Sequence, residues 1–90
     1  MSARYRRGDS VRVAALENEG VLLHLGTRRY YTVSESALAL LEYLAAPRTA
    51  QELEAFLLER YELTEEHAVT TVQTFLERCR KADVVFEEGA

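Results

Sequence analysis

The chain has few of the residues on which metal, redox and covalent chemistry depend. Its 90 residues include one cysteine, two histidines and no tryptophan. A single cysteine forms no disulfide within the chain, and Cys79, His24 and His67 do not have the spacing of a metal site. We therefore expect no metal ion and no cofactor.

Glycine, proline and long apolar runs are scarce as well. The four glycines are widely separated, which argues against a glycine-rich phosphate loop, and the single proline argues against a disordered chain. No apolar run approaches the roughly 18 residues of a membrane span, and no apolar stretch typical of a signal peptide follows the basic first residues. The sequence predicts a folded cytoplasmic protein with no membrane contact.

The length and the placement of the acidic residues argue against an enzyme. A chain of 90 residues predicts one domain, residues 1–90, which buries only about 60 to 65% of its unfolded surface. Such a core leaves little room for a deep, water-excluding pocket of about 300 Å³. The pairs Glu65-Glu66 and Glu87-Glu88 are expected in solvent, at a helix end and in a C-terminal tail. We expect no catalytic residue.

Residues 11–33 have the pattern of three antiparallel strands. Alternating burial is expected over residues 11–15, residues 21–25 form a short apolar run, and residues 29–33 are rich in aromatic and β-branched side chains. Turn-forming residues separate the three segments. In a sheet with the order first, second, third, the third strand is an edge.

Three helices are expected after these strands. Ser34, Thr49 and Thr64 have the positions of N-caps, Glu52 completes a capping box with Thr49, and Pro47 ends the first helix. The helices are expected over residues 35–46, 50–61 and 65–82. A three-stranded antiparallel sheet followed by three helices predicts an α+β fold of the winged helix-turn-helix kind.

Because this architecture binds DNA in many proteins, the distribution of charge matters. Residues 1–32 hold six arginines and three acidic residues, whereas residues 33–90 hold five basic and twelve acidic residues. The third helix begins with Glu65-Glu66, which would lie against phosphate if this helix entered a DNA groove. The charges therefore disfavour nucleic acid, although the N-terminal arginines, Arg4, Arg6 and Arg7, could contact phosphate.

The third strand is the best candidate for a binding surface, because an edge strand can accept a peptide as a further strand. On the third helix, one row is expected to face the core, namely Ala68, Val72, Phe75 and Cys79, and a second row is expected to border a groove, namely Val69, Gln73, Leu76 and Arg80. The alternative is that the whole apolar stripe is core. The candidate peptide-binding residues are Arg28, Arg29, Tyr30, Tyr31, Thr32, Val33, Val69, Val72, Gln73, Leu76 and Arg80.

The details of this surface depend on register. A shift of one residue would exchange Tyr30 and Tyr31 between the two faces of the sheet, so the sequence leaves open which of them faces the peptide. The basic residues Arg28, Arg29 and Arg80 could meet carboxylates of the peptide. If Leu76 borders the groove, Leu76→Asp is expected to weaken peptide binding and leave the helices folded.

Four segments of the chain resemble the PqqD-like family. They are residues 20–37 (GVLLHLGTRRYYTVSESA), residues 40–44 (LLEYL), residues 47–49 (PRT) and residues 75–79 (FLERC). Members of that family are peptide-recognition domains of pathways that make ribosomally synthesised and post-translationally modified peptides. The resemblance implies that the leader segment of a precursor peptide adds as a strand to residues 28–33. It also implies that the leader lies against the face of the third helix formed by residues 69–80.

Two positions depart from the family pattern. Many relatives have Leu-Asn where this chain has Val33-Ser34, and residues 25–28 replace the Tyr-Pro-Glu-Gly of the pyrroloquinoline quinone branch. The chain is most similar to the discrete recognition protein of lasso-peptide pathways, which implies a precursor leader peptide, a separate leader peptidase and a cyclase as partners. The alternatives are a pyrroloquinoline quinone peptide carrier of the same fold and a winged-helix DNA-binding protein.

Overall fold

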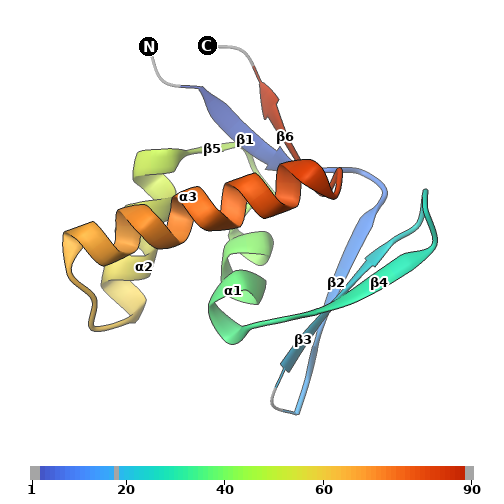
Figure 1. Cartoon of the computed structure of the whole chain (residues 1–90), viewed down its shortest axis with the longest axis horizontal. Coiled ribbons are helices and arrows are strands. Elements are labelled where there is room, and N and C mark those ends of the chain that lie inside the picture. The colour runs from blue at the N-terminus through green and yellow to red at the C-terminus, as the bar shows by residue number, and fades with distance from the viewer. Residues whose placement is uncertain (1–2, 18, 89–90) are drawn as a thin grey trace.

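Three helices and two small antiparallel sheets make up residues 3–17 and 19–88, which are the residues described by the computed structural model (Figure 1). The first sheet consists of β2 (Val11–Leu16), β3 (Glu19–His24) and β4 (Arg29–Val33). The second sheet consists of β1 (Arg4–Arg7), β5 (Arg48–Thr49) and β6 (Val85–Glu88). The helices are α1 (Glu35–Tyr43), α2 (Ala50–Arg60) and α3 (Glu65–Lys81). The predicted α+β class is confirmed.

The sheet β2-β3-β4 is the meander that the sequence predicts. Its strands follow one another in chain order, and the register places Leu22 of β3 opposite Tyr31 of β4. Among the described residues β4 pairs only with β3, so the prediction of an edge strand is confirmed. The N–H and C=O groups on its free side therefore have no strand partner within this sheet.

The second sheet was not predicted. The N-terminal arginines form β1, which pairs with residues 85–88 near the other end of the chain, from Arg4 opposite Glu88 to Arg7 opposite Val85. Glu87 and Glu88 are exposed, as expected, but they belong to β6 and not to a C-terminal tail. Neither strand alternates between buried and exposed residues. Their pairing joins distant parts of the chain, which a local pattern cannot reveal.

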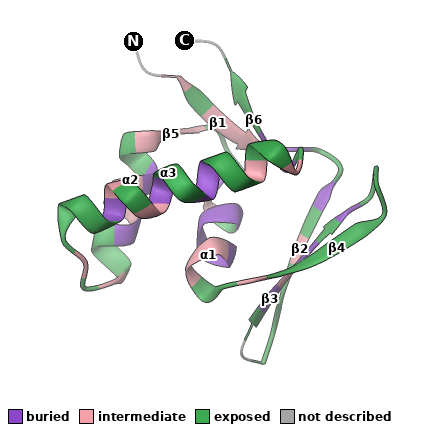
Figure 2. Ribbon diagram, viewed as in Figure 1, coloured by how far each residue is buried: buried purple, intermediate pink, exposed green. Residues whose placement is uncertain are grey.

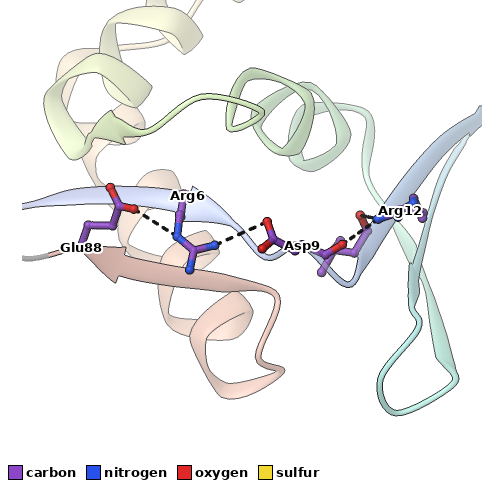
Figure 3. Close-up of polar contacts among 5 residues, drawn as sticks. Arg6, Asp9, Arg12 and Glu88 are labelled. Atoms are coloured by element: carbon purple, nitrogen blue, oxygen red, sulfur yellow. Dashed lines mark hydrogen bonds and ion pairs between the residues drawn. The ribbon is translucent and has the colours of Figure 1, made fainter.

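Two of the N-terminal arginines, Arg6 and Arg7, make side-chain contacts within the fold. The Nε of Arg6 lies 3.1 Å from Oε2 of Glu88, and its guanidinium lies 5.5 Å from the ring centroid of Phe86. Figure 3 shows Arg6 between Glu88 and Asp9. Arg7 donates a hydrogen bond to the carbonyl oxygen of Leu41 near the C-terminal end of α1, at 3.0 Å. Both cations are thus engaged in the fold, which weakens the case that they bind phosphate.

The three predicted N-caps are confirmed. Ser34 Oγ accepts the N–H of Ala37 at 3.2 Å, and Thr64 Oγ1 accepts the N–H of His67 at 3.1 Å. Thr49 forms the expected capping box with Glu52, whose carboxylate accepts the Thr49 N–H, and this hydrogen bond holds the pKa of Glu52 below its ordinary value. These caps fix where α1, α2 and α3 begin.

The first helix ends earlier than expected. Its last residue is Tyr43 instead of the residue before Pro47. The backbone N–H of Arg7 donates to the carbonyl oxygen of Leu44, and Arg48 Nε donates to that of Tyr43. Residues outside α1 thus bind carbonyl groups that its last turn leaves free, and the chain turns away before the proline.

The core lies where α1 meets α2, α3 and the first sheet. Figure 2 shows buried residues on the facing sides of the three helices. The largest fully buried side chains come from all parts of the fold: Leu40, Leu41, Leu44, Leu53, Leu57, Val11, Val72, Val84 and Val85. This packing fixes α3 relative to α1 and therefore decides which face of α3 lies toward β4.

His24 joins the β3–β4 turn to the loop after α3. Its Nε2 lies 3.1 Å from the carbonyl oxygen of Asp83, and its Nδ1 accepts the N–H groups of Gly26 and Thr27 at 3.1 and 3.2 Å. Because Nδ1 accepts two hydrogen bonds, the proton of the neutral ring is on Nε2, which donates to Asp83. His24 is buried, and its ring links the turn to the loop after α3.

Two substitutions at His24 are expected to separate its roles. In His24→Asn, the side-chain oxygen can replace Nδ1 as the acceptor in the turn, but the side chain is too short to reach Asp83. In His24→Gln, the side-chain amide can donate to the carbonyl oxygen of Asp83, but it no longer accepts the N–H groups of the turn. Each variant is expected to lose about 1 kcal/mol of unfolding free energy in urea denaturation. Wild-type stability of His24→Asn would show that the bond to Asp83 contributes nothing.

Candidate functional site

An open groove of about 640 Å³ lies between β4, the first turns of α1 and one face of α3. The edge strand contributes one wall, α3 contributes the other, and side chains of α1 and β3 form the floor. The lining residues are Leu22, Tyr31, Thr32, Val33, Ser34, Ser36, Ala37, Leu40, Leu41, His67, Thr70, Thr71, Thr74, Phe75, Arg78, Cys79, Ala82 and Val84.

The register of β4 decides which tyrosine faces the groove. Tyr31 lies opposite Leu22, which is buried on the helix side of the sheet, and both residues line the groove. Tyr30 lies opposite Leu23 on the other side of the sheet and is 73% exposed. Tyr31, and not Tyr30, therefore faces the groove.

Only part of the predicted strand lines the groove. Tyr31, Thr32 and Val33 belong to the lining, whereas Arg28, Arg29 and Tyr30 do not. Arg28 has a φ of 62°, a left-handed conformation typical of a turn, and precedes the strand. The part of β4 that can present both its free backbone edge and a groove-lining side chain to a ligand is therefore residues 31–33.

The predicted row of α3 does not border this groove. Val69, Val72, Gln73, Leu76 and Arg80 are absent from the lining. Val72 and Leu76 are 1% and 7% exposed and pack in the core, so Leu76 is not the partly exposed residue that we expected. Arg80 lies 3.5 Å from the Glu87 carboxylate of β6, away from β4.

The groove face of α3 lies on the other flank of its apolar stripe. It consists mainly of His67, Thr71, Thr74 and Arg78, with Phe75 and Cys79 at the border with the core. Successive helical residues are 100° apart, so this flank and the flank of Val69, Gln73 and Arg80 lie on nearly opposite sides of α3. The periodicity correctly predicts the buried stripe but does not tell which flank faces the sheet. The row of threonines beside the stripe could have indicated which flank of α3 borders the groove.

The groove combines an apolar floor with a hydroxyl-rich rim. The partly exposed residues Val33, Ala37 and Ala82 supply apolar surface above the buried Leu22 and Leu40, and the threonines of α3 supply donors and acceptors. Burial raises the pKa of the Cys79 thiol to about 12, so this side chain is present as a neutral thiol. This combination suits an extended ligand with alternating apolar and polar groups.

Two further findings concern the described part of the chain. Within residues 3–17 and 19–88, no three side chains of histidine, cysteine, aspartate or glutamate come together as they would around a metal ion. None of the helices described there has the length and apolar character needed to cross a membrane.

Comparisons with known proteins support the fold. The model of the family described as "Coenzyme PQQ synthesis protein D (PqqD)" matches residues 19–85. A solved structure described as "TbiB1 in Complex with the TbiA(beta) Leader Peptide" is 21% identical, with a TM-score of 0.79, and the match covers 94% of this chain and 96% of that chain. A second, "Lasso peptide synthetase B1 complexed with the leader peptide", is 17% identical, with a TM-score of 0.76 and coverage of 91% and 96%. No curated protein matched the chain.

Proposed function

Because the chain belongs to the PqqD family, we propose that it binds the leader segment of a ribosomally made precursor peptide in the groove between β4 and α3. In this proposal it holds the precursor for separate maturation enzymes, a leader peptidase and a cyclase, in lasso-peptide biosynthesis. Support comes from the two solved structures of similar fold, which are both described as complexes with a leader peptide.

The observation that carries the proposal is the open edge of β4 beside the groove. An extended peptide that pairs with residues 31–33 would satisfy the free N–H and C=O groups of the strand. Side chains of a strand point alternately to its two faces, so every second peptide residue would enter the groove toward Ala37 and Phe75. Main-chain bonds would then provide affinity, and the groove would provide selectivity.

The protein would act by holding the precursor and would make or break no bond. The groove lining contains one thiol, that of Cys79, which burial keeps neutral, and one histidine, His67, at the first turn of α3. A bound precursor has a raised effective concentration at an enzyme that contacts the same protein, which accelerates maturation without any catalytic group here.

Hydrogen exchange provides the test of strand addition. A peptide selected from a displayed random library is expected to slow exchange of backbone amides in β4 by about tenfold or more at saturation, because they gain hydrogen bonds. Amides of β2, the opposite edge of the same sheet, serve as the control and are expected to be unchanged. Protection of β2 instead of β4 would contradict the proposal.

A titration with duplex DNA tests the main rival. The first turn of α3 holds Glu65 and Glu66, both exposed, which disfavours insertion of this helix into a DNA groove. Tight binding of duplex DNA with a steep salt dependence, together with no binding of any selected peptide, would overturn the proposed function.

A further inference from the structure

The groove excludes acidic residues although the protein is acidic. The chain has 15 aspartates and glutamates and a formal net charge of −4. None of the residues lining the groove is acidic, and one of them, Arg78, is a permanent cation. The charge of the groove is thus opposite in sign to the charge of the whole protein.

Arg78 has no ionic partner among the described residues. The ion pairs found there involve Arg6 and Arg80, but not Arg78. Its neighbours on the helix surface three and four positions away are Phe75, Lys81, Thr74 and Ala82, and none of them is acidic. The guanidinium therefore keeps its hydrogen-bonding capacity for a group outside the chain.

A second cation lies toward the same end of the groove. Arg29 is the first residue of β4 and lies opposite His24, which is bonded to Asp83 just after α3. The start of β4 is thus close to the C-terminal end of α3, where Arg78 lies. Arg29 also shares a strand face with Tyr31, two positions further along. Asp83 is a carboxylate at this end, but it is exposed and does not line the groove.

We propose that the groove selects leader peptides that carry an aspartate or glutamate at the position facing Arg78. This inference rests on the proposed function and adds a fixed acidic position to it. A guanidinium can form two parallel hydrogen bonds with a carboxylate, so it favours this group over an amide or hydroxyl by geometry as well as by charge. The acidic residue fixes the register of the peptide along β4.

Another explanation for Arg78 is stabilisation of α3 alone. Arg78, Arg80 and Lys81 all lie in the last turn of α3, where cations interact favourably with the negative end of the helix dipole. That role would be shared by Arg78 and Arg80, and it would place no demand on the peptide sequence. The experiment therefore measures the sequence preference of the bound peptides, and a substitution of Arg80 serves as the matched control.

The test is selection from a displayed library of random peptides of about 12 residues. His67 and Arg78 are separated by about 16 Å along the helix, which an extended peptide spans with about five residues, so this length exceeds the groove. Against the wild-type chain, aspartate or glutamate is expected at one position at a fixed distance from an apolar residue. Against Arg78→Glu, lysine or arginine is expected at that position, and against Arg80→Glu the wild-type preference is expected.

Affinities of the selected peptides complete the test. For Arg78→Gln we expect about tenfold weaker binding of an acidic peptide and little change for the same peptide with glutamine at that position. This variant also covers the case in which Arg78→Glu does not fold, which circular dichroism would reveal. If the selected peptides share an apolar residue but no aspartate or glutamate at a fixed position, this inference is overturned and the proposed function is left intact. Failure to enrich any peptide would overturn both.

Discussion

Replacement of Thr74 with tyrosine is expected to weaken peptide binding by about 100-fold, or about 2.7 kcal/mol. Thr74 is exposed and lines the groove from α3, so a ring at this position would occupy the space between α3 and β4. Threonine and tyrosine have similar helix propensities, and the fold should therefore be kept. Fluorescence anisotropy with a labelled peptide from the selection measures the effect.

The adjacent residue provides the matched control. Gln73 is also exposed, but it lies on the other flank of α3 and does not line the groove. Gln73→Tyr makes nearly the same chemical change and is expected to alter binding by less than about threefold. If Gln73→Tyr weakened binding and Thr74→Tyr did not, the peptide would lie on the flank that the sequence pattern suggested.

The local elements could be predicted from the sequence because their causes are local. Turn residues between short apolar runs give the three strands of the meander, and single side chains that bond to nearby backbone groups give the helix starts at Ser34, Thr49 and Thr64. The edge position of β4 also follows from chain order alone. These features require no knowledge of how distant segments meet.

The features that the sequence did not reveal all depend on distant contacts. The pairing of β1 with β6 joins Arg4 to Glu88, and neither strand has a burial pattern of its own. The flank of α3 that faces β4 is decided by how this helix packs on α1 and α2. Likewise, Tyr31 is distinguished from Tyr30 only by its pairing with Leu22.

The placement of the groove also changes the set of residues expected to bind peptide. The sequence pattern placed Val69 and Leu76 of α3 at the groove, because the apolar stripe is wider than a thin core requires. In the structure, Val33 of β4 and Ala37 of α1 are partly exposed and provide apolar surface to the groove. The exposed side of α3 can therefore be polar and still form one wall of the groove.

Leu76→Asp is expected to unfold most of the protein, in contrast to the effect on binding alone that the sequence pattern suggested. Leu76 is 7% exposed and belongs to the main core cluster with Val72 and Leu53. Removing a buried leucine side chain costs about 2 to 5 kcal/mol, and placing a carboxylate in the same site adds to this cost. A domain of 90 residues is stabilised by only about 5 to 13 kcal/mol, so the loss is a large fraction of the total.

Thermal and urea denaturation followed by circular dichroism measure this effect. Leu76→Met is the matched control, because it nearly conserves side-chain volume without adding charge and should cost less than about 1.5 kcal/mol. A folded Leu76→Asp protein with wild-type stability and weakened peptide binding would place Leu76 on the peptide surface. That result would contradict the packing of α3 against the core and, with it, the assignment of Thr74 and Arg78 to the groove.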